Sequence, residues 1–376
     1  MAAETRPASS DERVLFFPEV EAFGGGERSY LALLGWLHAQ GIPHRALTYR
    51  DAADIERFAP FPLAKTQLLP PPGARAKIAS LKRHFGEREY RYTPMVAGLQ
   101  GALHATSAGM RGFHTLMLDT PTLFKAGTGQ GPTPKERVRD VGINLVLRRG
   151  LNSGGRTIVN SEFLRNETRR LWKADADIIR MGGLEGEHEF RPRRPQGGLR
   201  MLSISRIEAN KRIDWMVRAL AELERGERPL SARVDWHLDV AGKGSLLDAS
   251  RELARSLGVG DRVHFLGFVP DERVEELYAN ADVFLMPAVQ GYGIPAIESL
   301  TRGLPVLLHR ESGVSDILLD TPWCVVIEGD ERAMAPGLLK IVESILRGDH
   351  LNAPLPNIPT EAEWAERVAR DCGWLG

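Results

Sequence analysis

Cysteine and long apolar runs are both scarce in this sequence of 376 residues. The two cysteines, Cys324 and Cys372, are far apart, which excludes a disulfide framework and a cysteine zinc cluster and fits a reducing compartment. No apolar stretch reaches the roughly 18 residues of a membrane span, and the first residues lack the apolar core of a signal peptide. We therefore expect a soluble, cytoplasmic protein.

An excess of charge of one sign is also absent, because 49 basic residues balance 49 acidic ones. A neutral chain has no general field that attracts nucleic acid, so we expect no nucleic-acid partner, and any recognition of phosphate must be local. One basic cluster surrounds the start of a helical pattern near residue 75. It is either a solvated helix face, which we favour, or a peripheral contact with anionic lipid headgroups. Its members are Arg75, Lys77, Lys82, Arg83 and Arg88.

What the sequence does contain is an alternation of short apolar runs with helical patterns, and this alternation occurs twice. The length suits two domains of similar size. Strands that alternate with helices predict the α/β class with parallel sheets. Residues 191–198 combine proline, glycine and charge, as a linker does. We predict an N-terminal domain over 1–185, a C-terminal domain over 197–355, and a final helix within 356–376 that packs back on the first domain.

The element pattern can be placed along the chain. Helical spacing is present over residues 29–40, and Asn160 or Ser161 is expected to cap a second helix. In the second half, Asn210 is expected to cap the helix that contains Ile213. Short apolar runs predict buried strands at 14–17, 116–118, 157–159, 199–205, 234–240, 263–266, 283–286, 305–308 and 324–327.

Ligands of open parallel sheets bind outside the carboxyl ends of the strands, so the residues that follow each strand are candidates. Ser205 and Arg206 end the first strand of the second half, and Lys211 opens the next helix. A guanidinium can bind two phosphate oxygens, and an ammonium adds charge beside helix amides that favour anions. A solvated basic loop is the alternative for this pair taken alone.

Glycines end the next two strands. Gly242 and Gly244 either allow close approach of a ligand or serve a tight turn. At Gly267 and Phe268, backbone groups either hold the edge of a nucleobase or belong to an ordinary strand end.

The segment after the strand at 283–286 is the most informative. Two glycines flank an aromatic residue in 291–293, so the backbone amides can point at one anion or group of hydroxyls. Pro295 suits the first position of a helix. Glu298 is then expected in the first turn, where a carboxylate either binds a ribose diol or complements the helix dipole.

Together these segments resemble a known family. The stretches SISRIEANKRIDWMVRAL, DVAGKGS, VHFLGFVPDERVEELYANADVFLMP and QGYGIPAIESLTRGLPVL are similar to the retaining family-four glycosyltransferases of GT-B architecture. The resemblance is strong over about 199–308 and fainter before it, where GGGE at 24–27 resembles the family's glycine loop. It implies two facing Rossmann-like domains and transfer of a sugar from a nucleotide-diphosphate donor with retention of configuration.

The resemblance also implies roles for individual residues. Arg206 and Lys211 would neutralise the departing diphosphate, and Glu298 would bind the ribose hydroxyls. No metal or cofactor is implied, and the nucleotide sugar is a substrate. The candidate catalytic residues are Arg206, Lys211, Gln290 and Glu298. The candidate donor-binding residues are Gly25, Gly26, Ser205, Arg206, Lys211, Gly242, Gly267, Phe268, Gly291, Tyr292, Gly293, Ile294 and Glu298.

Two positions depart from the family pattern. The family usually carries two glutamates seven residues apart, and here the first position is Gln290. An amide cannot stabilise a cationic sugar as a carboxylate can, which suggests altered donor preference, slower turnover or lost activity. At LMLDTPTLF, relatives often have His-Thr-Pro, and here Asp119 takes the first place. Asp119 holds a donor or acceptor hydroxyl, or it is a turn residue at a strand end, which we favour.

Other clusters are set aside. Asp175 and Asp177 resemble a metal-binding Asp-X-Asp but lack further ligands nearby, and His104 and His114 are expected to be ordinary helix or surface residues.

From the resemblance we predict a glycosyltransferase that acts on a saccharide, lipid-linked or small-molecule acceptor. The alternatives are a weakened sugar-nucleotide binder, suggested by Gln290 and Asp119, and a non-hydrolysing epimerase, for which no acid/base pair is evident.

Overall fold

The computed structural model describes residues 10–21, 23–119, 133–181, 190–318 and 321–375. The chain divides into two compact units: the N-terminal unit holds the described residues up to 181 and those from Pro359 onward, and the C-terminal unit holds those from 190 to Ile358. The expected domain boundary at 185, and the part of LMLDTPTLF after Asp119, lie outside the described residues. Among the described helices, none has the length and apolar character needed to cross a bilayer.

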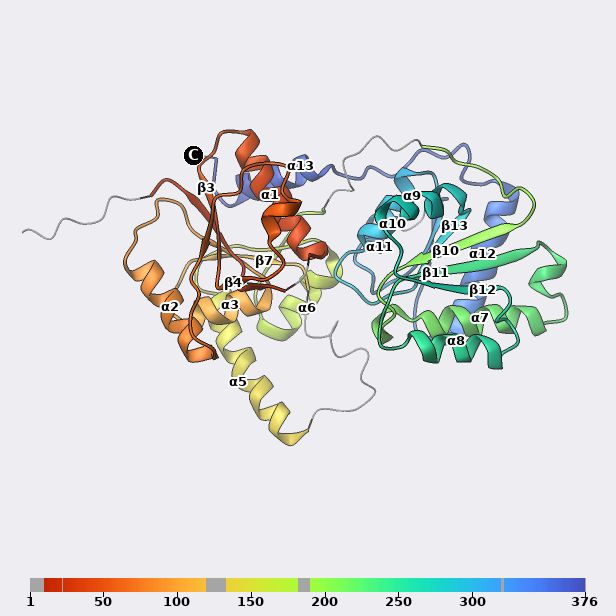
Figure 1. Cartoon of the computed structure of the whole chain (residues 1–376), viewed down its shortest axis with the longest axis horizontal. Coiled ribbons are helices and arrows are strands. Elements are labelled where there is room, and N and C mark those ends of the chain that lie inside the picture. Colours follow the sequence, from red (N-terminus) through yellow and green to blue (C-terminus); the bar gives the residue numbers. More distant parts are fainter. Residues whose placement is uncertain (1–9, 22, 120–132, 182–189, 319–320, 376) are drawn as a thin grey trace, which may run out of the picture. The chain divides into compact units, whose positions relative to one another are not determined.

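The N-terminal unit is built on a seven-stranded parallel sheet in the order β5-β3-β1-β6-β7-β8-β9, with a separate pair β2-β4. Its strands are β1 (Arg13–Phe16), β2 (Glu19–Val20), β3 (His44–Thr48), β4 (Arg50–Asp51), β5 (Lys65–Gln67), β6 (Met95–Ala97), β7 (His114–Met117), β8 (Thr157–Val159) and β9 (Asp177–Ile178). Its helices are α1 (Gly25–Ala39), η1 (Ile55–Phe58), α2 (Ala74–Gly86), α3 (Gly98–Ser107), α5 (Pro134–Leu151), α6 (Glu162–Trp172) and α13 (Glu361–Asp371). Figure 1 shows α1 and α13 beside each other, and α3 next to both α2 and α5.

Helix caps explain where two of these helices begin. The hydroxyl of Ser161 accepts a hydrogen bond from the amide of Leu164 at 3.2 Å, so the predicted cap of α6 is confirmed. The start of α1 was predicted at residue 29, and this prediction is wrong by four residues, because α1 begins at Gly25. The carboxylate of Glu27 accepts from the Gly24 amide at 3.1 Å, and this cap allows the glycines to form the first turn.

The C-terminal helix belongs to the N-terminal unit. α13 packs against α1, and Trp364 and Trp374 are buried there. The indole of Trp374 donates to the carbonyl of Thr93 at 2.9 Å, and its own carbonyl accepts from the guanidinium of Arg13 at 2.7 Å and 2.8 Å. The last residues are therefore held by both apolar burial and hydrogen bonds to distant strands.

The C-terminal unit has a six-stranded parallel sheet in the order β12-β11-β10-β13-β14-β15. Its strands are β10 (Leu199–Ile204), β11 (Trp236–Ala241), β12 (Val263–Gly267), β13 (Val283–Met286), β14 (Val306–His309) and β15 (Cys324–Ile327). Its helices are η2 (Ala209–Lys211), α7 (Ile213–Arg225), η3 (Leu230–Ala232), α8 (Leu247–Ser256), α9 (Asp271–Asn280), α10 (Ile294–Thr301), α11 (Ser315–Leu318), η4 (Glu331–Ala333) and α12 (Met334–Arg347).

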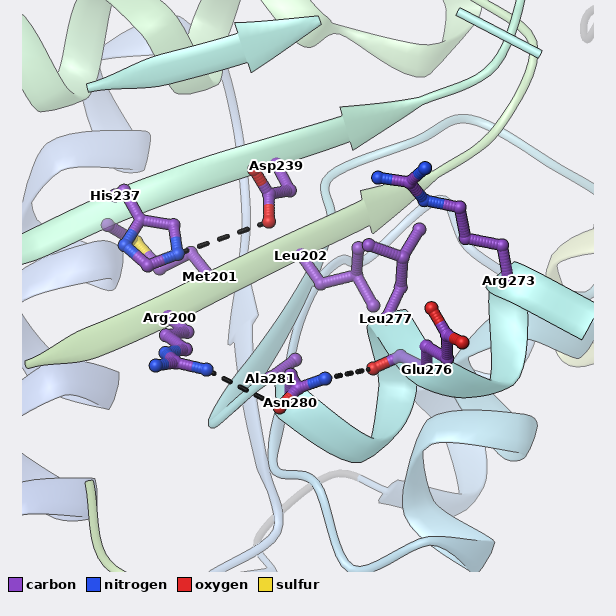
Figure 2. Close-up of a pocket in the computed structure, with 10 residues that line it drawn as sticks. All are labelled: Arg200, Met201, Leu202, His237, Asp239, Arg273, Glu276, Leu277, Asn280 and Ala281. Atoms are coloured by element: carbon purple, nitrogen blue, oxygen red, sulfur yellow. Dashed lines mark hydrogen bonds and ion pairs between the residues drawn. The ribbon is translucent and has the colours of Figure 1, made fainter. Parts of the chain in front are cut away.

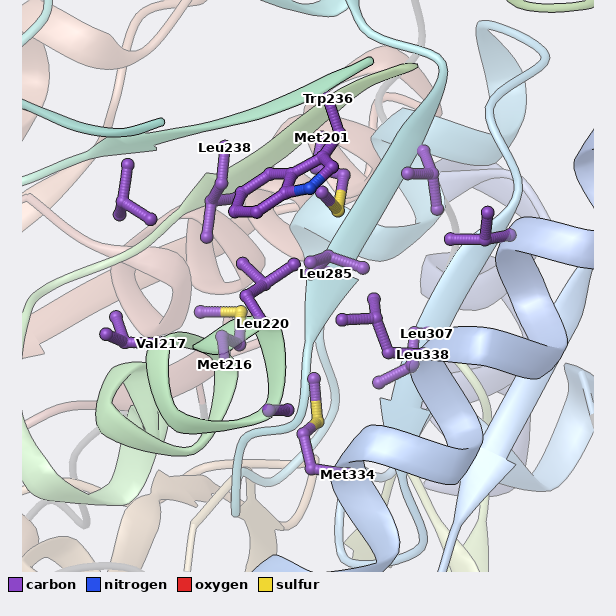
Figure 3. Close-up of a cluster of buried hydrophobic side chains, with 14 of the residues drawn as sticks. Met201, Met216, Val217, Leu220, Trp236, Leu238, Leu285, Leu307, Met334 and Leu338 are labelled. Carbon is purple, nitrogen blue, oxygen red and sulfur yellow. The ribbon is translucent and has the colours of Figure 1, made fainter. Parts of the chain in front are cut away.

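Burial of one sheet face against α7 and α12 forms the core of this unit. Figure 3 shows Met216 and Leu220 of α7 and Leu338 of α12 pointing toward Leu285 and Leu307 in the centre of the sheet. All of these side chains are essentially inaccessible to solvent, and their spacing on the helices is the apolar stripe that a helix turns toward a sheet. This core holds the strands whose ends carry the candidate residues.

The expected cap at Asn210 is wrong. Asn210 lies inside η2, and Arg212, with a left-handed φ of 54°, separates η2 from α7. The Asn210 amide group donates instead to the carbonyl of Val289 at 3.1 Å.

Strands β3 and β6 were not predicted from the sequence. In β3 the few apolar residues stand between the polar residues His44 and Thr48, and β6 has only three residues.

We predict that Trp374→Ala destabilises the chain by about 3–5 kcal/mol, because it empties a fully buried indole site and leaves the Thr93 carbonyl without its donor. Urea unfolding followed by circular dichroism measures the change. Leu375→Ala is the matched control, since the neighbouring Leu375 side chain is 39% exposed and should cost less than about 1 kcal/mol. Equal effects of the two substitutions would contradict the packing of the C-terminal segment described above.

Candidate functional site

Four candidate segments of the C-terminal unit lie along one edge of its sheet. The strands β12, β11, β10 and β13 are neighbours and parallel, so their carboxyl ends point the same way. Arg206 follows β10, Gly242 follows β11, Gly267 ends β12, and Gln290 comes four residues after β13. We call this region the carboxyl edge. In open parallel sheets this is the edge at which ligands bind.

Hydrogen bonds join the loop after β10 to the loop after β13. Asn210 accepts from the Val289 amide at 2.9 Å through its carbonyl and donates to the Val289 carbonyl through its side chain. Arg212 donates to the carbonyl of Pro287 at 3.3 Å and pairs with Glu311 at 2.7 Å. These hydrogen bonds join the two loops, which together support the side chains between them.

The central contact of the site is between Lys211 and Gln290. The Lys211 ammonium donates to the side-chain carbonyl of Gln290 at 2.7 Å. The amide nitrogen of Gln290 donates to the hydroxyl of Ser312 at 3.1 Å and faces the sulfur of Met286 at 2.9 Å. Gln290 is thereby fixed at both ends of its amide, and its oxygen is turned toward the lysine.

Burial and a neighbouring cation make the Lys211 charge costly. Burial is the larger cause and the positive charge of Arg206 the second, and together they lower the pKa of Lys211 to about 8. Gln290 supplies one acceptor but no negative charge. The ammonium is thus held in a position where an anion would stabilise it.

Arg206 presents its guanidinium to solvent at the same edge. Its side chain is exposed, and within the described ranges no other group forms a hydrogen bond with the guanidinium. It is close enough to act on the pKa of Lys211 and, as a minor cause after the hydrogen bonds from Ser245, on that of Glu208. Arg206 and Lys211 therefore form one positive locus at the carboxyl edge.

Two glycines allow the close packing of this edge. Gly293 has φ 126°, and a Cβ there would lie 2.8 Å from the amide nitrogen of Gln290, so the glycine makes room for that side chain. Gly242 has φ 141°, and a Cβ there would lie 1.8 Å from the carbonyl oxygen of Ser205. The two alternatives for Gly242 were close approach of a ligand and a tight turn. The geometry shows a third reason for the glycine, the close approach of the Ser205 backbone.

An aromatic ring stands at the far end of the edge. The Phe268 side chain is 68% exposed, and the Lys243 ammonium lies 5.2 Å from the centre of its ring. Gly267 beside it has φ 70° and open space around its Cα. An exposed flat ring beside a cation offers a surface on which a planar group can stack.

Glu298 occupies a different place from the one expected. α10 begins at Ile294 with Pro295 second, so Glu298 is the fifth helical residue, and its predicted placement in the first turn is wrong. The hydroxyl of Tyr278 donates to the Glu298 carboxylate at 3.0 Å. Tyr278, whose pKa is raised by burial, stays protonated and can fix the orientation of this carboxylate.

The N-terminal unit contributes three candidates at its own sheet. Gly25 and Gly26 form the first turn of α1, the helix that follows β1. Asp119 is exposed just after β7, in the same sheet. Its negative charge, after the larger effect of burial, raises the pKa of Tyr30 on α1. Asp119 and the glycine turn therefore lie at the same carboxyl edge of that unit, close to Tyr30.

The residues set aside as metal ligands have structural partners. Asp175 pairs with Arg169 and Asp177 with Arg156, each at 2.9 Å. In the described part of the chain no three histidine, cysteine or carboxylate side chains are arranged to hold a metal ion. His114 was expected in a helix or on the surface, and this is wrong, because it is buried in strand β7.

The sequence did not indicate two residues that support the site, namely Ser312 and Tyr278. Ser312 lies 22 residues from Gln290, Tyr278 lies 20 residues from Glu298, and neither carries a motif of its own, so only folding brings them together.

A cavity of about 260 Å³ lies elsewhere on the C-terminal unit. Figure 2 shows it between α9 and the amino-terminal halves of β10 and β11, with Arg200, His237, Asp239 and Arg273 around it. Arg200 and His237 lie toward the amino ends of these strands, whereas Arg273, in the first turn of α9, lies toward their carboxyl ends. We assign no substrate to this cavity and use it below as a control region.

Solved structures with the same fold are glycosyltransferases. The chain superposes on WaaG, a glycosyltransferase involved in lipopolysaccharide biosynthesis, with a TM-score of 0.66 and 20% identity over 96% of this chain and 95% of that one. It superposes on Anabaena Alr3699/HepE, solved with UDP and glucose, with a TM-score of 0.69 and 13% identity over 96% and 99%. The fold is the α/β architecture of GT-B glycosyltransferases, with a parallel sheet in each of two units, as predicted.

Residues 185–347 match the family model described as Glycosyl transferases group 1. The matched segment includes the stretch over which the sequence resembles family-four glycosyltransferases most strongly, and that resemblance is confirmed. A similar relative is the GDP-mannose-dependent alpha-(1-6)-phosphatidylinositol monomannoside mannosyltransferase of Mycolicibacterium smegmatis, 33% identical over 140 residues, which are 35% of each protein. The chain spans 29% to 51% of the length of these curated relatives.

We predict that Gly242→Ala lowers the free energy of unfolding by about 3 kcal/mol, since its methyl group would overlap the Ser205 carbonyl and the backbone is left-handed. Gly267→Ala is the control, because that glycine also has a positive φ but open surroundings, and it should cost about 1 kcal/mol. Urea unfolding of both variants checks the difference. If Gly242→Ala were as stable as Gly267→Ala, the loops at the carboxyl edge would not be in contact as described.

Proposed function

We propose that this chain transfers a sugar from a nucleotide-diphosphate donor to a saccharide, lipid-linked or small-molecule acceptor, with retention of the anomeric configuration. The observation that carries the proposal is the positive locus of Arg206 and Lys211 at the carboxyl edge. The family of residues 185–347 and the names of the relatives, which include a GDP-mannose-dependent enzyme and a protein solved with UDP and glucose, support the same class of donor.

In this proposal the two cations act on the leaving group. The bond from the anomeric carbon to the phosphate oxygen breaks, the acceptor oxygen bonds to that carbon, and the acceptor proton passes to the departing diphosphate. Arg206 can bind two phosphate oxygens, while Lys211 gives a point charge in a half-buried place where its interaction with an anion is strong. The proposal assigns neutralisation of the diphosphate to these two residues and not to a metal.

Gln290 would position the Lys211 ammonium for the phosphate. Its carbonyl holds the Lys211 ammonium at 2.7 Å without neutralising it, so the full charge remains for the phosphate. A carboxylate in this position would form an ion pair with Lys211. The same amide is less able to stabilise a cationic sugar, which predicts slower turnover than in relatives with glutamate.

The remaining groups suit the rest of the donor. Glu298, oriented by Tyr278, would bind the ribose hydroxyls, and the backbone amides of 291–294 would face the sugar or phosphate. The exposed ring of Phe268 would stack on the nucleobase. Gly25 and Gly26, at the amino end of α1, would contribute amides to the diphosphate.

A second candidate is a sugar-nucleotide binder with little activity, which Gln290 and the exposed Asp119 favour. Turnover separates the two functions. The chain is incubated with UDP-, GDP- and ADP-sugars and a set of saccharide and lipid-linked acceptors, and free nucleotide and elongated acceptor are measured by mass spectrometry. Binding of a nucleotide sugar without either product would favour the binder.

Arg206→Ala should weaken binding of the preferred nucleoside diphosphate about thirtyfold, or about 2 kcal/mol, through loss of a charge-assisted contact. Isothermal titration calorimetry with UDP, GDP and ADP measures it. Arg200→Ala is the matched control, because it removes the same charge from the cavity at α9, at the amino end of β10, and should leave affinity unchanged. Unchanged affinity in Arg206→Ala together with a loss in Arg200→Ala would place the ligand in that cavity and contradict the proposal.

The pKa of Lys211 predicts how binding depends on pH. With a pKa of about 8, the ammonium is present below pH 8 and is lost above it, while the diphosphate is already fully charged. Affinity for the nucleoside diphosphate should therefore fall about tenfold between pH 7 and pH 9. Lys211→Met should bind weakly at both values and show no such fall.

Gln290→Glu tests the origin of this pH dependence. A carboxylate against the ammonium raises the pKa of Lys211, so the loss of affinity should move to higher pH. The same calorimetric series is run on the variant. An unshifted profile in Gln290→Glu, or a persistent fall in Lys211→Met, would show that another group controls binding.

A further inference from the structure

The outward side of α5 is an apolar stripe that the rest of the described chain leaves uncovered. Val138, Val141 and Leu145 follow one another at helical spacing and are 75%, 60% and 63% exposed. Figure 1 shows the amino-terminal part of α5, in yellow, extending past α3 in the N-terminal unit. Three adjacent aliphatic side chains on one exposed helix face form a contiguous patch, which marks an interaction surface in soluble proteins.

The stripe is not needed to hold α5 in place, because the opposite side of the helix is already packed. Leu147 is buried, and the indole of Trp172 on α6 donates to Asn144 at 2.9 Å. A Cβ at Gly150 would lie 1.9 Å from the hydroxyl of Thr106, so α5 is pressed closely against α3. A helix that is apolar on both sides needs cover on both sides.

Arginines border the stripe. At about 100° per residue, Arg148 and Arg149 project from the two sides of the stripe, one turn after Leu145 toward the carboxyl end of α5. Both arginines are exposed, and no ion-pair partner for either is present in the ranges that the structure describes. Aliphatic side chains flanked by basic ones match the interface of an anionic bilayer, in which the former enter the acyl boundary and the latter meet the headgroups.

The basic cluster of α2 offers a useful contrast. Lys77 is already paired with Glu19 at 2.7 Å, and Leu81 on the same helix is fully buried. α2 therefore presents charges without exposed large apolar side chains, as a solvated helix face does. α5 presents both.

We propose that the outward face of α5 docks this protein on an anionic lipid surface, with Val138, Val141 and Leu145 inserted and Arg148 and Arg149 at the headgroups. The proposal is independent of sugar transfer, since it concerns a helix of the N-terminal unit that carries none of the candidate donor-binding residues. It would bring an enzyme with a lipid-linked acceptor to the membrane that contains that acceptor.

Co-sedimentation of the full chain with phosphatidylcholine vesicles, with and without phosphatidylglycerol, tests this proposal. Wild type should bind the vesicles that contain phosphatidylglycerol, and binding should weaken as salt shortens the Debye length. The triple substitution V138Q/V141Q/L145Q should reduce partitioning to the vesicles by about tenfold or more, because glutamine preserves the helix but does not insert into the bilayer. R148Q/R149Q should reduce it about 25-fold, at about fivefold for each arginine.

K82Q/R83Q is the matched control, because it removes the same charge from α2 and should change partitioning little.

Absence of vesicle binding by wild type would overturn the proposal, as would equal binding by the triple variant. Light scattering that shows a dimer in wild type and a monomer in the triple variant would identify a second copy as the occupant instead. A triple variant with a lowered melting temperature would point to a covering segment of this chain. Nucleoside diphosphate affinity should be unchanged in every α5 variant, so the proposed function can fail or hold separately.

Discussion

The parallel pairing of β10 with β13 is the constraint on which the candidate site depends. Met201 and Leu202 pair with Val283 and Phe284, so both strands end at the same edge and their loops leave the sheet side by side. The Asn210 bridge between the loops then sets the distance at which Lys211 meets Gln290. Any change that shifted one strand against the other would separate these groups, because a parallel register moves a whole loop with its strand.

Preorganisation of this edge has a local cost. A half-buried ammonium beside a guanidinium is unfavourable, and the lowered pKa of Lys211 is the expression of that cost. The neutral Gln290 relieves it only in part, while Gly242 and Gly293 let the backbone close tightly around the pair. Fixed charges that lack an anion partner favour a ligand that carries negative charge, and they need little rearrangement when it binds.

The two units divide the proposed tasks. The C-terminal unit carries the cations and the carboxylate proposed for the nucleotide, in segments that follow the strands of a sheet whose core includes Leu285 and Leu307. The N-terminal unit carries the glycine turn of α1 and the apolar stripe of α5. It also includes the last helix of the chain, because Trp364 and Trp374 find their burial against α1 and the neighbouring strand ends and not beside the residues that precede them.

The sequence by itself determined the α/β class, the two halves, and the positions of the strand ends that carry Arg206, Gly242 and Gln290, because apolar runs and glycines report local burial and turns directly. It also limited the cap of α6 to Asn160 or Ser161, and the structure assigns it to Ser161, through a contact within four residues. Tertiary structure alone decided that Asn210 bridges loops instead of capping α7, and that Ser312 and Tyr278 orient the site. It alone showed which apolar side chains of α5 remain outside the core. These outcomes depend on contacts between segments far apart in the chain, and periodicity along the chain carries no information about them.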